Sequence, residues 1–231
     1  MVNMRTLAVG ALGVVLSTHS LHSQVRSRYR DYNLGGNLSS ISALTGAAAS
    51  EAKTIHLRPA MMQELQWQRP YSLSGTTPAQ MDPVKQIVFS FYDDQLSKMV
   101  VDYDRDRTAG MTDADVIDAI SAEYGTRLKP GVKTSRGVVS HVEEESGTPV
   151  ARWGDAEFSV VLYRSSYESG FRIIVTSPRL EALARTADVQ ASRLDEREAP
   201  AREIARQKKE TDDARADQEK ARLANKAVFR P

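Results

Sequence analysis

QIVFSFYDDQLSKMVVDY, residues 86–103, is the stretch that decides the fold of this chain. Two runs rich in β-branched and aromatic residues, 87–91 and 96–103, flank a short polar turn, which is typical of an antiparallel hairpin. A two-residue loop would place Phe89 opposite Lys98, whereas a three-residue loop would place Phe89 opposite Met99. We expect the second register because it buries both apolar side chains on one face.

Two short helices with well-defined ends lie on either side of this hairpin. Asn37 is a suitable N-cap for the first, and Gly46 supplies a left-handed stop. Thr112 begins the second, Asp115 completes an acidic variant of the capping box, and Gly125 ends it. Their apolar stripes are Leu38, Ile41 and Leu44 in the first helix, and Val116, Ile117, Ile120 and Tyr124 in the second.

The order of predicted elements repeats. A helix, then an extended run with a tryptophan (Trp67 or Trp153), then a hydrophobic hairpin occurs twice. Further strands are expected at 53–57, 63–67, 138–142, 158–163 and 171–176. The fold class is therefore predicted as α+β: two helix-plus-antiparallel-hairpin units, 34–103 and 112–177, form one sheet domain over 34–177, followed by a long charged C-terminal helix.

This order of helix, glycine, tryptophan and hairpin, twice over, resembles the tandem helix-plus-sheet architecture of beta-lactamase inhibitory protein and of small outer-membrane assembly lipoproteins. It also resembles several groups of uncharacterised exported bacterial proteins. The likeness covers residues 34–177 and lies in element order; the chain lacks the cysteine of the lipoproteins and the disulfides of the inhibitor. The resemblance implies a protein-binding sheet without catalysis.

The segment 178–231 is highly charged, with 13 Lys/Arg and 11 Asp/Glu, and is expected to form a helical tail that buries little surface. Pro200 predicts a break or a fresh N-terminus. The stripe Ile204, Thr211, Ala214, Ala221 and Val228 is small and polar for a coiled coil. Both a solvated single helix and pairing with a partner helix remain open.

The N-terminus has the three-part layout of a signal peptide. Residues 1–5 form a short basic segment, residues 7–16 are apolar, and small polar residues surround a cleavage site after Ser20. We therefore predict a signal peptide at 1–20, a polar leader at 21–33, and a periplasmic or secreted location. The apolar run is too short for a permanent anchor, so no stable membrane anchor is expected after cleavage.

Composition narrows the classes of partner and chemistry. There is no cysteine, which removes disulfides and thiolate chemistry. The net charge is +1, so nucleic acid is not an expected partner. His56 and His141 lack the spacing of a metal site, and the alternating Asp102, Asp104 and Asp106 lack the glycine and glutamate of a calcium loop. No catalytic, cofactor or metal residue is predicted.

The candidate interaction residues are Trp67, Trp153, Arg69 and Phe229. Our first hypothesis is a non-enzymatic exported envelope protein that binds another envelope protein through its sheet or its helical tail. The alternative is a small-ligand module for a glycan, lipid or peptide, with a groove near Trp67 and Trp153. The sequence leaves the oligomeric state open.

Overall fold

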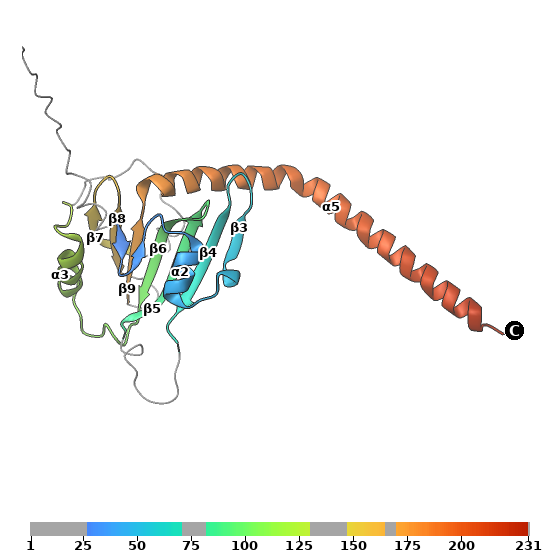
Figure 1. Ribbon diagram of the computed structural model, residues 1–231, viewed down its shortest axis with the longest axis horizontal. Coiled ribbons are helices and arrows are strands. Elements are labelled where there is room, and N and C mark those ends of the chain that lie inside the picture. Colours follow the sequence, from blue (N-terminus) through green and yellow to red (C-terminus); the bar gives the residue numbers. More distant parts are fainter. Residues whose placement is uncertain (1–26, 71–81, 130–146, 165–169, 231) are drawn as a thin grey trace, which may run out of the picture.

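The computed structural model describes residues 27–70, 82–129, 147–164 and 170–230, and its fold class is α+β, as predicted. A seven-stranded sheet carries the helices, and one long helix extends far beyond it (Figure 1). The predicted signal peptide, the strand expected at 138–142 and His141 lie outside the described residues. The elements are β1 (Arg28–Tyr29), β2 (Tyr32–Asn33), α2 (Leu38–Thr45), the 3₁₀ helix η1 (Ala49–Glu51), β3 (Lys53–His56), β4 (Met62–Gln68), β5 (Val84–Tyr92), β6 (Gln95–Tyr103), α3 (Asp113–Tyr124), β7 (Thr148–Gly154), β8 (Ser159–Arg164), β9 (Phe171–Thr176) and α5 (Pro178–Val228).

The large sheet is antiparallel throughout, in the order β3-β4-β5-β6-β9-β8-β7. Strands β3-β4-β5-β6 form one meander and β7-β8-β9 form another, and the last strands of the two meanders, β6 and β9, pair with each other at the centre. There β6 and β9 pair with Met99 opposite Val175 and Val101 opposite Ile173. Helix α2 precedes the first meander and α3 the second, so the two helix-plus-hairpin units form one sheet.

The central hairpin has the predicted register but not the predicted loop. Phe89 lies opposite Met99, and both are fully buried. The loop has two residues, Asp93 and Asp94, both with positive φ, rather than three. A β-bulge at Ser97 supplies the missing residue, and its hydroxyl donates to the carbonyl of Ser90 at 2.9 Å.

Contacts from distant parts of the chain fix this turn. The carboxylate of Asp93 accepts a hydrogen bond from the backbone N–H of Met61 at 2.9 Å, and that of Asp94 accepts one from the N–H of Leu38 at 2.9 Å. These bonds stabilise two aspartates in the left-handed region, which aspartate tolerates better than most residues. The loop length therefore depends on tertiary structure.

One face of the sheet bears the main hydrophobic core. Alternate residues of the strands point to it, and α2 and α3 cover it with Ile41, Val116, Ile120 and Tyr124. Burying side chains of this size contributes roughly 1.5–3 kcal/mol each. The largest of the fully buried side chains are Trp153, Phe89, Phe91 and Phe158.

The N-terminal hairpin belongs to this core. Tyr29 is buried, and Tyr32 packs edge-on against Phe89 with ring centroids 4.9 Å apart. Tyr29 and Tyr32 lie opposite one another in the two-stranded sheet. Residues 28–33, within the segment predicted as a polar leader, thus form part of the folded domain.

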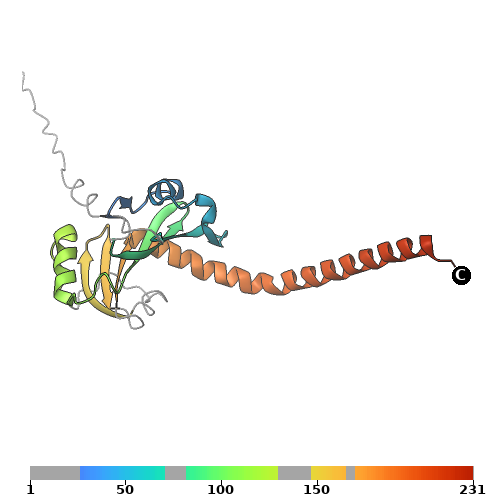
Figure 2. The ribbon, with the colours of Figure 1, turned by 90° about the horizontal axis from the view of Figure 1, so that it is seen from below.

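The opposite face carries a smaller cluster and the base of α5. Val100, Val161, Tyr163 and Ile174 are buried there. Lys98, which points to the same face as Val100, approaches Glu181 of α5 at 3.8 Å. The long helix and α2 therefore lie on opposite sides of the sheet (Figure 2).

The close approach of the two strands at the β7–β8 turn can be tested by substituting Gly154. Its φ is +142°, and an added Cβ would lie 2.3 Å from the backbone oxygen of Phe158, whose position the hairpin fixes. We expect Gly154→Ala to lower the free energy of unfolding by about 2–4 kcal/mol, measured by urea denaturation.

Gly46 is the matched control because its φ is +74° and no atom lies within 4 Å of a built Cβ. Gly46→Ala should cost about 1 kcal/mol from backbone strain alone. Equal losses in the two variants would contradict the close contact at Gly154.

Candidate functional site

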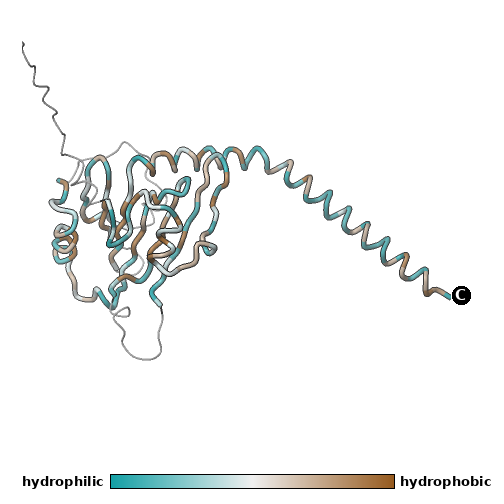
Figure 3. Tube along the Cα trace, in the orientation of Figure 1, coloured by the Kyte–Doolittle hydropathy of each residue, from teal (hydrophilic) through white to brown (hydrophobic). Residues whose placement is uncertain are grey.

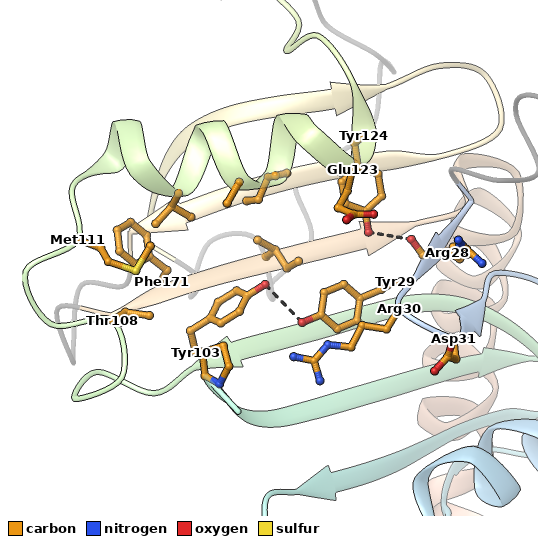
Figure 4. A pocket seen from close by; sticks show the side chains of 15 residues that line it. Arg28, Tyr29, Arg30, Asp31, Tyr103, Thr108, Met111, Glu123, Tyr124 and Phe171 are labelled. Carbon is orange, nitrogen blue, oxygen red and sulfur yellow. Dashed lines mark hydrogen bonds between the residues drawn. The ribbon is translucent and has the colours of Figure 1, made fainter. Parts of the chain in front are cut away.

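A pocket of about 500 Å³ lies between α3 and the centre of the sheet (Figure 4). Its walls come from α3, from residues at the ends of β6 and β9, and from the N-terminal hairpin. It is therefore located where the two halves of the sheet meet. This volume is within the usual range of small-ligand sites.

The deeper part of the pocket is apolar. Val116 and Ile120 of α3 line it together with Phe171 and Ile173 of β9. The capping box of Thr112 begins α3 one turn before Val116, so the helix presents its buried stripe to the sheet from its first turn. This part of the pocket suits a hydrocarbon or aromatic group.

Tyrosines provide the polar groups of the interior. The hydroxyls of Tyr29 and Tyr103 are 3.3 Å apart, and the hydroxyl of Tyr124 donates to the backbone carbonyl of Arg28 at 2.7 Å. Burial raises the pKa of all three phenols above the ordinary value. They are therefore neutral at physiological pH and act as hydrogen-bonding groups rather than as bases.

Four charged residues line the pocket, Arg28, Arg30, Asp31 and Glu123, and among the described residues only Arg30 has an ion-pair partner. Arg30 forms a bidentate pair with Asp82 at 2.6 and 2.7 Å. Burial opposes ionisation of Asp82, but hydrogen bonds from Arg30 and from the backbone of Val84 hold its pKa below the usual value. Arg69 bridges the same region, donating to the carbonyl of Asp82 at 2.7 Å and pairing with Asp104.

This arrangement fits a neutral amphipathic ligand better than an ion. The interior is apolar, the phenols are neutral, and the two arginines and two acidic residues of the lining balance in charge, so the pocket provides no net field for a phosphate or a carboxylate. Within the described ranges, no group of three or more His, Cys, Asp or Glu is placed to hold a metal ion.

The two tryptophans do not form a common surface. Trp153 is fully buried, and its Nε1 donates to the hydroxyl of Ser121 on α3 at 3.1 Å. Trp67 is partly buried on β4, which is separated from β7 by four strands. The structure thus places Trp153 in the core, and a stacking platform made by both residues is not formed.

The candidate arginine has a structural partner, whereas the side chain of the candidate phenylalanine has none among the residues that the structure describes. Arg69, with Asp104, ties the end of β4 to the end of β6. Phe229 lies just beyond the far end of α5 and is 76% exposed. It is the most exposed of the four candidate interaction residues.

The first part of α5 is docked on the domain. Leu180, Ala184, Ala187 and Ala191 recur at helical spacing and are buried. A segment expected to bury little surface therefore contributes its own apolar stripe, and the folded domain extends past residue 178. Average composition hides this stripe because it consists mainly of alanine.

Side chains from the edge of the sheet hold the next turns. His56 Nε2 lies 3.1 Å from the carboxylate of Asp188, and Arg58 pairs with Glu198 at 2.8 Å. These contacts account for His56, which had no predicted partner. Among the described residues, Glu198 is the last residue of the helix with an ion pair to the sheet domain.

Beyond Glu198, α5 extends into solvent without a break. Every residue from 199 to 230 is exposed, and the helix continues to Val228, about 45 Å at 1.5 Å per residue (Figure 1). The break expected at Pro200 does not occur. Pro200 has no N–H to donate to the carbonyl of Glu196, one turn earlier in the helix. The side chain of Arg202 donates to the adjacent carbonyl, that of Asp195, at 3.0 Å.

No protein-family model matches this chain, and no curated protein or solved structure is significantly similar to it. Functional argument therefore depends on the pocket and the helix themselves. None of the helices in the described ranges has both the length and the hydrophobicity that a membrane crossing requires.

Sequence reasoning missed the pocket although it located most of its walls. Tyr103 was placed at a strand end and Tyr124 on the apolar stripe of a helix, but nothing local shows that they meet Tyr29. The sequence feature that could have indicated a pocket is the presence of several tyrosines at the ends of elements. Tyrosine often lies at the border between an apolar interior and water, because its ring is apolar and its hydroxyl is polar.

Docking of α5 can be tested with one substitution made at two positions of the same helix. Ala187→Asp puts a carboxylate into the buried helix–sheet contact and should lower the free energy of unfolding by about 2–4 kcal/mol in urea denaturation. Ala205→Asp, on the exposed part, should change it by less than about 0.5 kcal/mol. Similar effects at the two positions would show that residues 180–191 are not docked.

Proposed function

We propose that this chain is a non-enzymatic exported protein of the cell envelope that associates with another protein through the projecting part of α5. The single observation that carries the proposal is the exposure of the whole helix beyond Glu198. A hydrophilic helix of this length gains little from folding alone, because isolated helices are marginal in water. We therefore infer that the exposed helix is used as a surface for association with another protein.

The way in which the helix is held supports this role. Leu180, Ala184, Ala187 and Ala191 are buried on the sheet, so the direction of the free part is set by the domain. A rod with a fixed direction loses less entropy on binding than a flexible tail. Figure 3 shows that this rod is predominantly hydrophilic along its length, with hydrophobic residues near its free end.

The signal-peptide layout of residues 1–20 supports export and the envelope location in this proposal, and the tandem helix-plus-sheet order supports a binding role. The sheet face is the alternative contact surface in this proposal. The free helix is the better candidate because one face of the sheet is covered by α2 and α3, while Lys98 and neighbouring residues of the other face meet α5.

Truncation tests this function. Removing residues 201–231 takes away only the free part of the helix and the end of the chain, and it keeps Glu198, so the thermal midpoint should change by less than about 3 °C. Chemical crosslinking in intact cells should then give adducts with the full chain and none with the truncated chain. Unchanged adducts after truncation would refute the role of the helix.

The pocket favours a second function, the binding of a small neutral amphipathic molecule. A neutral hydrophobic fluorescent probe such as N-phenyl-1-naphthylamine tests whether the apolar interior is accessible. Ala119→Phe, at the pocket wall, should weaken probe binding at least about tenfold, whereas Ala122→Phe, on the same helix but outside the pocket lining, should not. Equal binding by both variants would place the probe elsewhere.

A further inference from the structure

The projecting part of α5 has one stripe that carries no charge. All fourteen charged side chains of residues 202–228 lie outside it, although they outnumber the uncharged ones. The stripe advances by alternating steps of three and four residues over the whole exposed helix. Its members are Ile204, Gln207, Thr211, Ala214, Gln218, Ala221, Asn225 and Val228.

Alternating steps of three and four define the heptad repeat of a coiled coil, whose seven positions are lettered a to g. Ile204, Thr211, Gln218 and Asn225 then occupy a, and the other four members of the stripe occupy d. A shallow groove on the helix surface coincides with this side. Its lining residues, all at positions a, d, e or g, are Gln207, Glu210, Thr211, Ala214, Arg215 and Gln218.

The residues that flank the stripe separate by sign. The g positions from 203 to 217 are all acidic, and the e positions from 208 to 222 are all basic. In a parallel pair of helices, each g residue faces the e residue five positions later in the partner. The three pairs, each formed twice by symmetry, are Glu203 with Lys208, Glu210 with Arg215, and Asp217 with Arg222.

We propose that the occupant of this stripe is a second copy of the same chain, aligned parallel and in register. The inference rests on the proposed function, that the free helix is an association element, and it names the partner. Self-complementarity supports a second copy because the acidic g set and the basic e set are present in one helix. An antiparallel pair would place e beside e and g beside g, which sets like charges against each other.

In the single chain these six charges have either an exposed partner on the same helix or no ion-pair partner among the described residues. Lys208 and Arg215 form no ion pair within the part of the chain that the structure describes. The other four, Glu203, Glu210, Asp217 and Arg222, pair with neighbours on their own helix, but those pairs are exposed and of the kind that contributes little. All four residues would exchange an exposed partner for one across the helix pair.

The composition of the stripe predicts a weak and reversible pair. Alanine, threonine and glutamine bury less apolar surface than leucine or isoleucine, so the charges rather than the stripe decide orientation. Asn225 at an a position favours a parallel two-stranded pair in register. Parallel alignment places the two sheet domains at one end and brings the exposed Phe229 of both chains together at the other.

Sedimentation velocity on the full chain over a concentration series to about 1 mM tests the pairing. The chain should convert from monomer to dimer, and reversing the e positions (Lys208→Glu, Arg215→Glu, Arg222→Glu) should raise the dissociation constant at least about tenfold. Reversing the g positions (Glu203→Lys, Glu210→Lys, Asp217→Lys) should do the same, and mixing the two reversed chains should restore the dimer.

The control variant carries Lys209→Glu, Lys220→Glu and Lys226→Glu. It makes the same change in net charge as the e reversal but at positions outside e and g, so it should keep the dimer.

The absence of cysteine allows a direct test of orientation. Asn225→Cys places one thiol at an a position, where the two Cα atoms of a parallel pair are close enough for a disulfide. Mild oxidation should give a covalent dimer of Asn225→Cys and none of Ala216→Cys, which lies at the outward f position. An antiparallel pair would hold the two introduced thiols about 30 Å or more apart and give no disulfide.

The outcomes separate this inference from the function on which it rests. A monomer at every concentration, or a dimer indifferent to reversal of the e and g charges, overturns pairing with a second copy. If that monomer still loses its cellular adducts on removal of residues 201–231, the helix binds a different protein and only this inference fails. If it forms no adduct at all, both fail.

Discussion

The pairing of β6 with β9 is the interaction on which the rest of the structure depends. It joins two meanders into one sheet, with Met99 opposite Val175 at the centre. It also fixes the start of α5, because β9 leads directly into the helix and the N–H of Ser177 donates to the carbonyl of Ser97 at 2.9 Å. The bulge at Ser97 therefore serves both the register of the hairpin and the attachment of the helix.

Anchoring also explains how so polar a helix persists beyond the domain. Nucleating a helix is costly, whereas extending one adds a hydrogen bond for each residue fixed. Leu180, Ala184 and Ala187 provide the nucleus by docking on the sheet, so the exposed part needs only to propagate. The charged segment can then use its side chains for recognition instead of for its own packing.

The sequence was most informative where structure is decided locally. The ends of α2 and α3 follow from Asn37, Gly46 and the Thr112–Asp115 capping box, and the pairing of Phe89 with Met99 follows from the need to bury both. Features that depend on distant contacts were missed. The turn at Asp93 is held by Met61, and the docked alanines of α5 were hidden in a segment whose average composition is polar.

The same distinction applies to the candidate site. Phe229 could be identified as an exposed aromatic because it follows a long charged segment, whereas only the folded sheet shows that Trp153 is core and that Tyr29, Tyr103 and Tyr124 gather at one pocket. Amide hydrogen exchange along α5 tests the central account most directly. Residues 180–195 should be strongly protected at every protein concentration, and residues 204–228 should become protected only as concentration rises. Weak protection at 180–195, or protection of 204–228 that does not depend on concentration, would contradict a helix that is docked at its base and pairs with a second copy along its free part.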